Sequence, residues 1–281
     1  SKMAMLSKPT LRCIAAVAFL FAIGTSTTSW AGPETWRSEW PRTDFSRHSI
    51  SYDEVLSGGP PRDGIPAIDH PKFAAIADVI DLAPQEPLIS IQINGDARAY
   101  PLRIMIWHEI VNDTVGGTPI TVTWCPLCNS AIIFDRRVSG QVLSFGTTGK
   151  LRHSDLIMYD RQTESWWQQF LGEGIVGGYT GTMLHALPSR VESVARFKAR
   201  FPSGRILVAP ADVGRPYGQN PYAGYDTSAT PVLYRGNYTG KIPPLARVVV
   251  LGDDAWPLEN LMKRRRIESG DLVLVWEPGQ A

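Results

Sequence analysis

Apolar residues along this chain come in short runs that alternate with polar residues, and glycine or proline separates many of these runs. Alternation with a period of two is typical of half-buried β-strands, and the separating residues are typical of turns. Asn94-Gly95 is a strong hairpin signal, and Ser139-Gly140 indicates a second hairpin. The alternation predicts strands over residues 88–93, 97–100, 118–124, 132–135, 141–145 and 205–208.

Helical spacing of apolar residues is less frequent and predicts helices over residues 70–80, 102–110 and 188–201. In the last of these, Ser189 and Glu192 have the spacing of a capping box, which bonds the free backbone N–H groups of a first helical turn. We therefore expect an α+β fold dominated by β-structure. Its strands would form mixed or antiparallel sheets or a partly closed barrel, with a few short helices.

Two stretches of the chain resemble two later stretches in the same order. The sequence that begins at Gly95 is echoed from Gly252, and the strand that ends at Pro126 is echoed by one that ends at Pro278. Each copy is expected to contain a hairpin, an aromatic-Pro-Leu sequence, a short helix and a strand with a tryptophan. Chance is the alternative, because aromatic-Pro-Leu is a simple motif. The pattern predicts repeat halves at about 88–150 and 246–281, of which the second lacks cysteine.

The N-terminal residues have the pattern of a secretory signal peptide. Lys8 and Arg12 precede an apolar run, Cys13 to Ile23, that is too short to cross a bilayer as a helix. Small and polar residues follow up to Ala31, where cleavage is expected. We therefore expect residues 1–31 to be removed and residues 32–281 to form a single periplasmic or secreted domain without stable membrane insertion.

Charge and cysteine content narrow the function classes. Loss of residues 1–31 leaves 25 basic and 27 acidic residues, a net charge of −2, so binding to nucleic acid is not expected. Cys125 and Cys128 are then the two remaining cysteines, in an oxidising compartment. We expect them to form a disulfide for part of the time unless a metal ion holds them.

Three interpretations of Cys125-Pro126-Leu127-Cys128 compete. A purely structural disulfide across so small a loop would stabilise the fold by only about 2 kcal/mol. A redox-active pair is the second, because bridges across small loops are often strained and easily exchanged. Trp124-Cys125-x-x-Cys128 is similar to the thioredoxin motif, but residues 129–138 predict a strand where that fold requires a helix. A thioredoxin fold is therefore rejected.

The third interpretation is a metal site, which needs ligands beyond the two thiolates. His108, in Trp107-His108-Glu109, and His153 are the candidates, and a site with two cysteines and histidine would suit copper or zinc. A single histidine is nevertheless more often a packed or surface residue than a ligand.

The sequence Ser154 to Trp167 is rich in acidic residues. Asp155, Asp160 and Glu164 could orient a histidine, bind a cation or transfer protons near the cysteines. The alternative is that Asp160 and the residues after it form a polar turn held by its own hydrogen bonds.

Several motifs together resemble the uncharacterised prokaryotic family known as domain of unknown function 3179. They are Tyr100 to Leu102, Trp107 to Asp113, Cys125 to Ala131, Phe134 to Arg136, Ser154 to Arg161 and Thr163 to Ser165. The resemblance extends over about residues 53–276. It implies redox chemistry at Cys125 and Cys128, because some relatives carry selenocysteine in this motif. It also implies that asparagine often occupies the position of His153, which weakens a ligand role there.

The leading hypothesis is a thiol–disulfide redox protein without a required cofactor. Cys125 would attack by analogy, Cys128 would resolve, and His108 would act as base or thiolate partner, oriented by Glu109 or Asp155. Its partner would be a redox protein or a small thiol or disulfide.

The first alternative is a copper or zinc carrier or assembly factor that binds metal through Cys125, Cys128 and one or both of His108 and His153. The second is a non-catalytic module in which some of the nine tryptophans line a binding groove.

Overall fold

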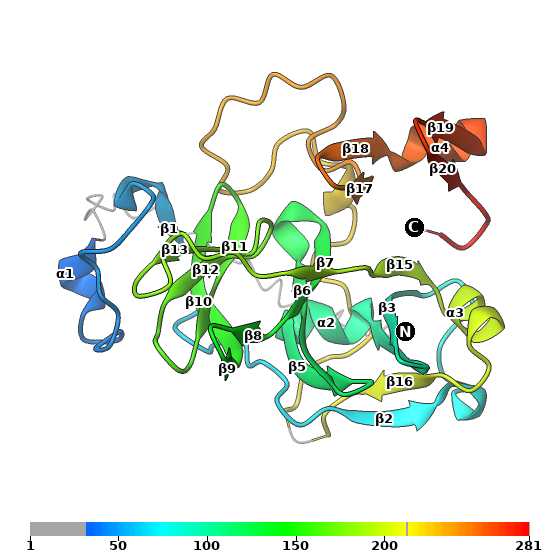
Figure 1. The fold of residues 1–281 in the computed structure, drawn as a ribbon, viewed down its shortest axis with the longest axis horizontal. Coiled ribbons are helices and arrows are strands. Elements are labelled where there is room, and N and C mark those ends of the chain that lie inside the picture. The colour runs from blue at the N-terminus through cyan, green and yellow to red at the C-terminus, as the bar shows by residue number, and fades with distance from the viewer. Residues whose placement is uncertain (1–31, 212, 281) are drawn as a thin grey trace, which may run out of the picture. The chain divides into compact units, whose positions relative to one another are not determined.

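The computed structural model describes residues 32–211 and 213–280 (Figure 1). The expected signal peptide, residues 1–31, lies outside the described residues. Strands make up 38% of the structure and helices 15%, so the predicted dominance of β-structure is confirmed. The sheets of the described chain are open, and none closes into a barrel. Within that part of the chain, each helix falls short of the length and apolar character that a membrane crossing requires.

Most strands belong to three sheets, which we call sheets A, B and C. In spatial order, sheet A comprises β1 (Val55–Ser57), β10 (Phe145–Arg152), β11 (Asp155–Asp160), β12 (Trp166–Gln168) and β13 (Glu173–Val176). Sheet B comprises β14 (Ala186–Leu187), β7 (Ser130–Asp135), β6 (Thr118–Cys125) and β5 (Ile110–Val115). Sheet C comprises β15 (Arg190–Ser193), β3 (Pro87–Ile93), β4 (Asp96–Pro101), β16 (Arg205–Val208) and β2 (Lys72–Ala75). Sheet C is mixed, because β16 runs parallel to β4.

The remaining elements are short. Two-stranded ribbons pair β8 (Arg137–Val138) with β9 (Gln141–Val142), β17 (Val248–Leu251) with β18 (Asp254–Pro257) and β19 (Arg266–Ser269) with β20 (Leu272–Val275). The α-helices are α1 (Pro33–Trp36), α2 (Leu102–His108), α3 (Val194–Arg200) and α4 (Leu258–Arg264). Single 3₁₀ turns are η1 (Tyr52–Glu54), η2 (Ile76–Asp78), η3 (Pro126–Cys128) and η4 (Tyr225–Thr227).

Sheet B lies between the other two sheets, as Figure 1 shows. Neighbouring residues of a strand point to opposite faces, so each strand of sheet B supplies two different cores. Val111 and Ile133 pack with side chains of sheet C and α2, whereas Ile110 and Phe134 pack with side chains of sheet A. Cys125 belongs to the core shared with sheet A. The pleat of β6 thus decides which sheet the first cysteine faces.

Hairpins were predicted better than helices. The hairpin at Asn94-Gly95 forms between β3 and β4, and the turn at Ser139-Gly140 connects β8 and β9. The predicted helix over 102–110 is α2, and the predicted strand over 205–208 is β16. The two hairpins are specified by local turn signals, which do not depend on distant residues.

Two helix predictions were wrong. Residues 70–80 form β2 and η2, because β2 pairs with β16 and places Phe73 edge-on to Tyr100 in the core. The helix expected over 188–201 begins only at Val194, and Ser193 is its cap, accepting a hydrogen bond from the Arg196 N–H. The preceding residues form β15 on the edge of β3. Pairing to an available sheet edge outweighed helical propensity in both places.

The two resembling stretches contain the same elements in the same order. The β3–β4 hairpin, α2 and the β5–β6 hairpin correspond to β17–β18, α4 and β19–β20. Each helix ends at a non-glycine residue with positive φ, Glu109 at 61° and Arg265 at 65°. In the first copy the carbonyl of Glu109 accepts a hydrogen bond from the backbone N–H of Trp124. In the second copy the carbonyl of Arg265 accepts one from the backbone N–H of Trp276. The next residue is Cys125 in the first copy and Glu277 in the second.

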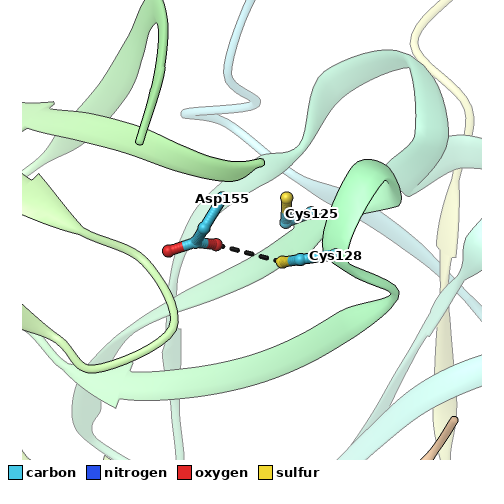
Figure 2. A group of neighbouring side chains, drawn as sticks. All are labelled: Cys125, Cys128 and Asp155. Atoms are coloured by element: carbon cyan, nitrogen blue, oxygen red, sulfur yellow. Dashed lines mark hydrogen bonds between the residues drawn. The ribbon is translucent and has the colours of Figure 1, made fainter. Parts of the chain in front are cut away.

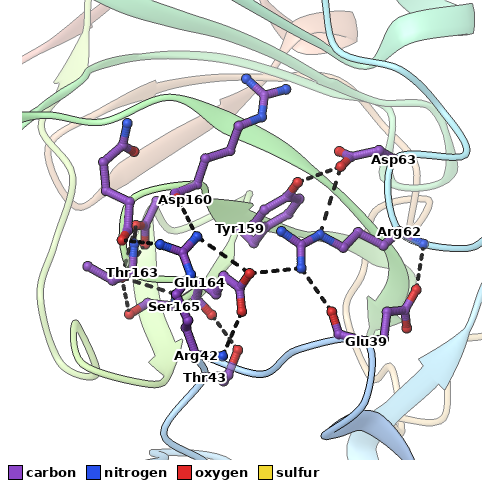
Figure 3. Close-up of polar contacts among 12 residues, drawn as sticks. Glu39, Arg42, Thr43, Arg62, Asp63, Tyr159, Asp160, Thr163, Glu164 and Ser165 are labelled. Carbon is purple, nitrogen blue, oxygen red and sulfur yellow. Dashed lines mark hydrogen bonds and ion pairs between the residues drawn. The ribbon is translucent and has the colours of Figure 1, made fainter.

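The buried carboxylate of Glu164 links the N-terminal segment to sheet A through hydrogen bonds (Figure 3). Glu164 accepts hydrogen bonds from the Arg42 backbone N–H at 2.9 Å and from Arg62 Nη1 at 3.0 Å. The Arg62 guanidinium lies 4.4 Å from the ring centroid of Trp40 and 4.5 Å from that of Tyr159. Glu164 therefore has a structural role.

The neighbouring acid, Asp160, forms a local turn. Its side chain accepts hydrogen bonds from Thr163 N at 2.6 Å and from Trp167 Nε1 at 2.9 Å. The turn interpretation therefore accounts for Asp160, and of the three acids only Asp155 remains a candidate for chemistry near the cysteines.

Replacing Glu164 by alanine should lower the free energy of unfolding by about 3 kcal/mol, because the partly buried Arg62 would be left with its longer ion pair to Asp63 and the Arg42 N–H would lose its acceptor. Urea unfolding measures this change. Glu34→Ala, which removes a highly exposed ion pair with Arg37, is the matched control and should change little. Equal, small effects of both substitutions would contradict the structural role of Glu164.

Candidate functional site

The two cysteines are placed by the end of β6 and the turn that follows it. Cys125 is the last residue of the strand, and Pro126 to Cys128 form the 3₁₀ turn η3. Asn129 closes this turn with a φ of 51°, a left-handed conformation that asparagine tolerates better than most residues. β7 then runs back beside β6, with Ser130 opposite Cys125. The predicted strand after the motif is thus present, and a helix does not follow the cysteines.

Sheet A supplies Asp155, which joins the two cysteines in the candidate site. The turn between β10 and β11 consists of His153 and Ser154, with φ values of 51° and 68°. Such a tight turn requires positive φ at both central residues and is most easily formed by asparagine and glycine. Asp155 is the first residue of β11 and is 5% exposed. The hairpin therefore carries a carboxylate into the space between sheets A and B.

The Cys128 thiol donates a hydrogen bond to Asp155 Oδ1 over 3.0 Å, as Figure 2 shows. Its sulfur also lies 2.9 Å from Ser130 Oγ. The Cys125 thiol donates to the Ser154 carbonyl over 3.7 Å. Both cysteines are free thiols, and one ligand atom of each, with a carboxylate oxygen of Asp155, lies within 4.8 Å of the other two.

Further polar groups hold the Asp155 carboxylate. Its Oδ2 accepts hydrogen bonds from Gln168 Nε2 at 2.5 Å and from the Phe170 backbone N–H at 2.9 Å. Gln169 extends the network, because its side-chain carbonyl accepts from Ser130 and its amide donates to Thr123. These two glutamines carry no recognisable motif, and they become neighbours of the cysteines only when sheets A and B pack together.

Burial sets the protonation of the site. It raises the pKa of the Cys125 thiol and raises that of the Cys128 thiol well above its usual range. Burial also raises the pKa of Asp155, although hydrogen bonds from Gln168 and Cys128 oppose this shift. The reduced pair therefore consists of two neutral thiols at neutral pH, one of which is hydrogen-bonded to a carboxyl group.

Glu109 is the second acid of the site. It is 7% exposed, and burial, with a smaller effect from the charge of Asp155, raises its pKa to about 8. The Glu109 charge in turn acts on Cys125 and on Tyr222, whose pKa burial and this charge raise to about 12. Glu109 is therefore a buried carboxylic acid, protonated at neutral pH and available as a proton donor.

His108 occupies a different place from the one expected. Its Nδ1 lies 2.7 Å from the Pro66 carbonyl and its Nε2 lies 2.6 Å from the Tyr217 hydroxyl. A carbonyl only accepts, so Nδ1 carries the proton and Nε2 accepts from tyrosine. Burial lowers the pKa of His108, which favours this neutral form. Both nitrogens thus have partners other than a cysteine, and His108 attaches the segment of Tyr217 to α2.

His153 lies at the rim of the site. Its side chain is 40% exposed, and Nε2 lies 3.9 Å from Glu54 Oε2. Among the described residues, the cluster of possible metal ligands contains Cys125, Cys128 and Asp155 but neither His108 nor His153. The structure thus joins three of the residues selected from the sequence, keeps Glu109 beside them, and separates the histidines from the sulfur atoms.

A long segment between β16 and β17 covers the cysteine turn. The Tyr225 hydroxyl donates to the Leu127 carbonyl at 2.7 Å, and Asn129 Nδ2 donates to the Leu245 carbonyl at 3.0 Å. Beside these contacts lies a pocket of about 310 Å³, with Cys128 and Asp155 in its lining. Cys125 is 1% exposed and lies in the core behind it. Cys128 is therefore the thiol that a molecule in the pocket can reach.

Fold and site define a class: a strand-dominated domain that buries a Cys-x-x-Cys pair and a carboxyl group where two sheets meet. The chain belongs to the family described as "Protein of unknown function (DUF3179)", which matches residues 62–281. The family resemblance seen in the sequence motifs is thus confirmed. Comparison with curated proteins and with solved structures gave no significant match. Function must therefore be argued from the site itself.

The raised pKa of Glu109 predicts a loss of stability with rising pH. Between about pH 4.5 and pH 8 the unfolded chain has released this proton while the folded protein retains it. Unfolding should thus become easier by about 1.4 kcal/mol per pH unit over this window. Glu109→Gln should flatten the profile, measured by urea unfolding from pH 5 to 8. Parallel profiles of the variant and the wild type would contradict the assignment.

Proposed function

We propose that this protein is a thiol–disulfide redox protein of the cell envelope in which Cys125 and Cys128 alternate between dithiol and disulfide. The observation that supports this most is the hydrogen bond of 3.0 Å from Cys128 to Asp155, at the lining of an open pocket. A carboxyl group with a raised pKa beside an accessible thiol is the arrangement that proton-coupled thiol chemistry needs.

Cys128 is the attacking thiol in this proposal. The analogy drawn from the sequence favoured Cys125, but that sulfur is in the core, whereas Cys128 lines the pocket. Thiol exchange requires the attacking sulfur to approach the disulfide in line with the breaking bond. The buried Cys125 is suited to a later, intramolecular step, in which it attacks the sulfur of Cys128 in the mixed disulfide.

The first step begins with proton transfer from the Cys128 thiol to the Asp155 carboxylate. The resulting thiolate attacks one sulfur of a substrate disulfide, so that a Cys128–substrate S–S bond forms and the substrate S–S bond breaks. The leaving thiolate takes the proton from Asp155 and departs as a thiol, which returns Asp155 to its carboxylate form for the second step. Burial raises the pKa of Asp155, which makes its carboxylate a stronger base than an exposed one, and it raises the pKa of Cys128, so the thiolate forms only as the substrate is attacked.

In the second step Cys125 attacks the sulfur of Cys128. Its proton passes to a buried carboxylate, for which Asp155 is within reach because its oxygen lies within 4.8 Å of both sulfurs. The Cys125–Cys128 bond forms and the second half of the substrate leaves as a thiol. Two electrons pass from the pair to the substrate, and a dithiol or thiol reductant restores the pair. The reverse sequence oxidises a substrate dithiol.

Metal binding is the second candidate function, and the cluster of three donor atoms favours it. Cys125, Cys128 and Asp155 could hold a copper or zinc ion with one coordination position open. This ligand set contains no histidine, unlike the site expected from the sequence. The thiols would have to lose their protons, so binding would weaken as pH falls. A carrier or assembly factor would use such a site.

Replacement of single residues tests the redox steps with bis(2-hydroxyethyl) disulfide as substrate. Cys128→Ser should abolish turnover, and Cys125→Ser should stop at a mixed disulfide on Cys128 that mass spectrometry detects. Asp155→Asn should slow the first step about 10²-fold at neutral pH, and less in alkali, where hydroxide removes the proton. Asp81→Asn, at an exposed position, is the control. Unchanged turnover in Cys128→Ser would refute the mechanism.

Elemental analysis with thiol counting separates the two candidate functions. For a redox pair we expect two thiols after mild reduction, no bound metal and a folded protein in both redox states. About one copper or zinc per chain, lost in Cys128→Ser but kept in His108→Ala, would instead support the metal site described above.

A further inference from the structure

The pocket at Cys128 differs in its chemistry from the site behind it. Most of its lining is apolar or aromatic, including Leu127, Phe170, Leu171, Tyr234 and Leu245, while the thiol and Asp155 form one side. A molecule whose disulfide reaches Cys128 must therefore place its neighbouring atoms against these apolar walls. This lining bears on which disulfides or thiols the proposed redox pair would accept.

Two of the apolar side chains extend into solvent beside the thiol. Phe170 is 48% exposed and Leu171 is 53% exposed. They lie on a tight turn in which the Gly172 N–H bonds the Gln168 carbonyl, and the Phe170 N–H bonds Asp155. The turn that presents this apolar edge is thus fixed to the carboxylate of the site. Adjacent exposed apolar side chains on a fixed turn are typical of a contact surface.

The charged groups of the pocket do not favour an anionic substrate. Its basic side chains are Arg152 and His153. Arg152 Nε lies 2.5 Å from Glu54 Oε2, and His153 Nε2 lies 3.9 Å from the same oxygen. A carboxylate-rich molecule such as glutathione disulfide would have to compete with Glu54 for the Arg152 guanidinium. An uncharged side chain would meet the apolar walls without that cost.

The size of the pocket limits what can enter it. A volume of about 310 Å³ is at the lower end of small-ligand pockets and suits one or two side chains. A disulfide buried inside a folded domain could not enter a pocket of this volume. An extended segment could do so, with its cysteine at the thiol and a neighbouring apolar residue against Leu171 and Leu245.

Building on the proposed redox function, we propose that the substrate is an extended polypeptide segment in which the reacting cysteine is flanked by leucine or phenylalanine. Cys128 exchanges with that cysteine while the flanking side chain packs on Phe170, Leu171 and the tyrosines of the pocket. The protein would thus act on incompletely folded polypeptides rather than on small anionic disulfides.

Two matched peptides test this proposal. Each carries one cysteine as a mixed disulfide with thionitrobenzoate, flanked by leucine and phenylalanine in one peptide and by aspartate and glycine in the other. Release of the coloured thiol by the fully reduced protein, with Cys13 replaced by serine, gives the rate of each. We expect the apolar peptide to react about tenfold faster or more, the discrimination that one apolar side chain provides.

Two variants locate the discrimination. Leu171→Ser should reduce the ratio of the two rates by several-fold. Val142→Ser, at a 49% exposed apolar position in β9, is the matched control and should leave the ratio unchanged. Equal rates for both peptides, or a faster acidic peptide, would overturn the proposed substrate class while leaving the redox function intact. No reaction with either peptide or with bis(2-hydroxyethyl) disulfide would overturn the redox function itself.

Discussion

The Asp155 carboxylate is the constraint on which the site depends. It stands at the start of a strand of sheet A and accepts hydrogen bonds from Cys128 of the neighbouring sheet and from Gln168 and Phe170 of its own side. A carboxyl group at this depth is tolerated only when such donors surround it. The same hydrogen bonds fix the position of the Cys128 thiol and of the turn that contains Phe170, and they connect the cysteine turn to sheet A.

The electrostatics of the site differ from those of a thiol activated at a helix N-terminus. Cys128 has carboxyl groups nearby, and burial disfavours its thiolate and the charged form of Glu109 alike. A resting thiolate is therefore not the reactive species. In the proposed redox mechanism the Cys128 proton must leave when a substrate approaches, and the hydrogen-bonded Asp155 carboxylate is the group that can accept it.

The sequence allowed the strand of the cysteine pair and the hairpin at Asn94-Gly95 to be predicted, because turn dipeptides and alternation act locally. Asp155 was selected as one of three acids, and the structure places it beside the cysteines. The sequence did not reveal that Gln169 bonds Ser130, or that His108 bonds Tyr217, because residues far apart in sequence form both contacts. β2 was mistaken for a helix for the same reason, since its pairing with β16 is a tertiary contact.

The second hairpin–helix–hairpin unit shows that the backbone arrangement around the cysteine motif forms without a cysteine. Its helix also ends at a left-handed residue whose carbonyl receives a tryptophan N–H, yet Glu277 stands where the first unit has Cys125. The backbone that aims residue 125 therefore forms without any sulfur. One chain thus contains the same backbone arrangement twice, once with a cysteine and once with a glutamate at the corresponding position, so the backbone alone does not determine the chemistry of that position.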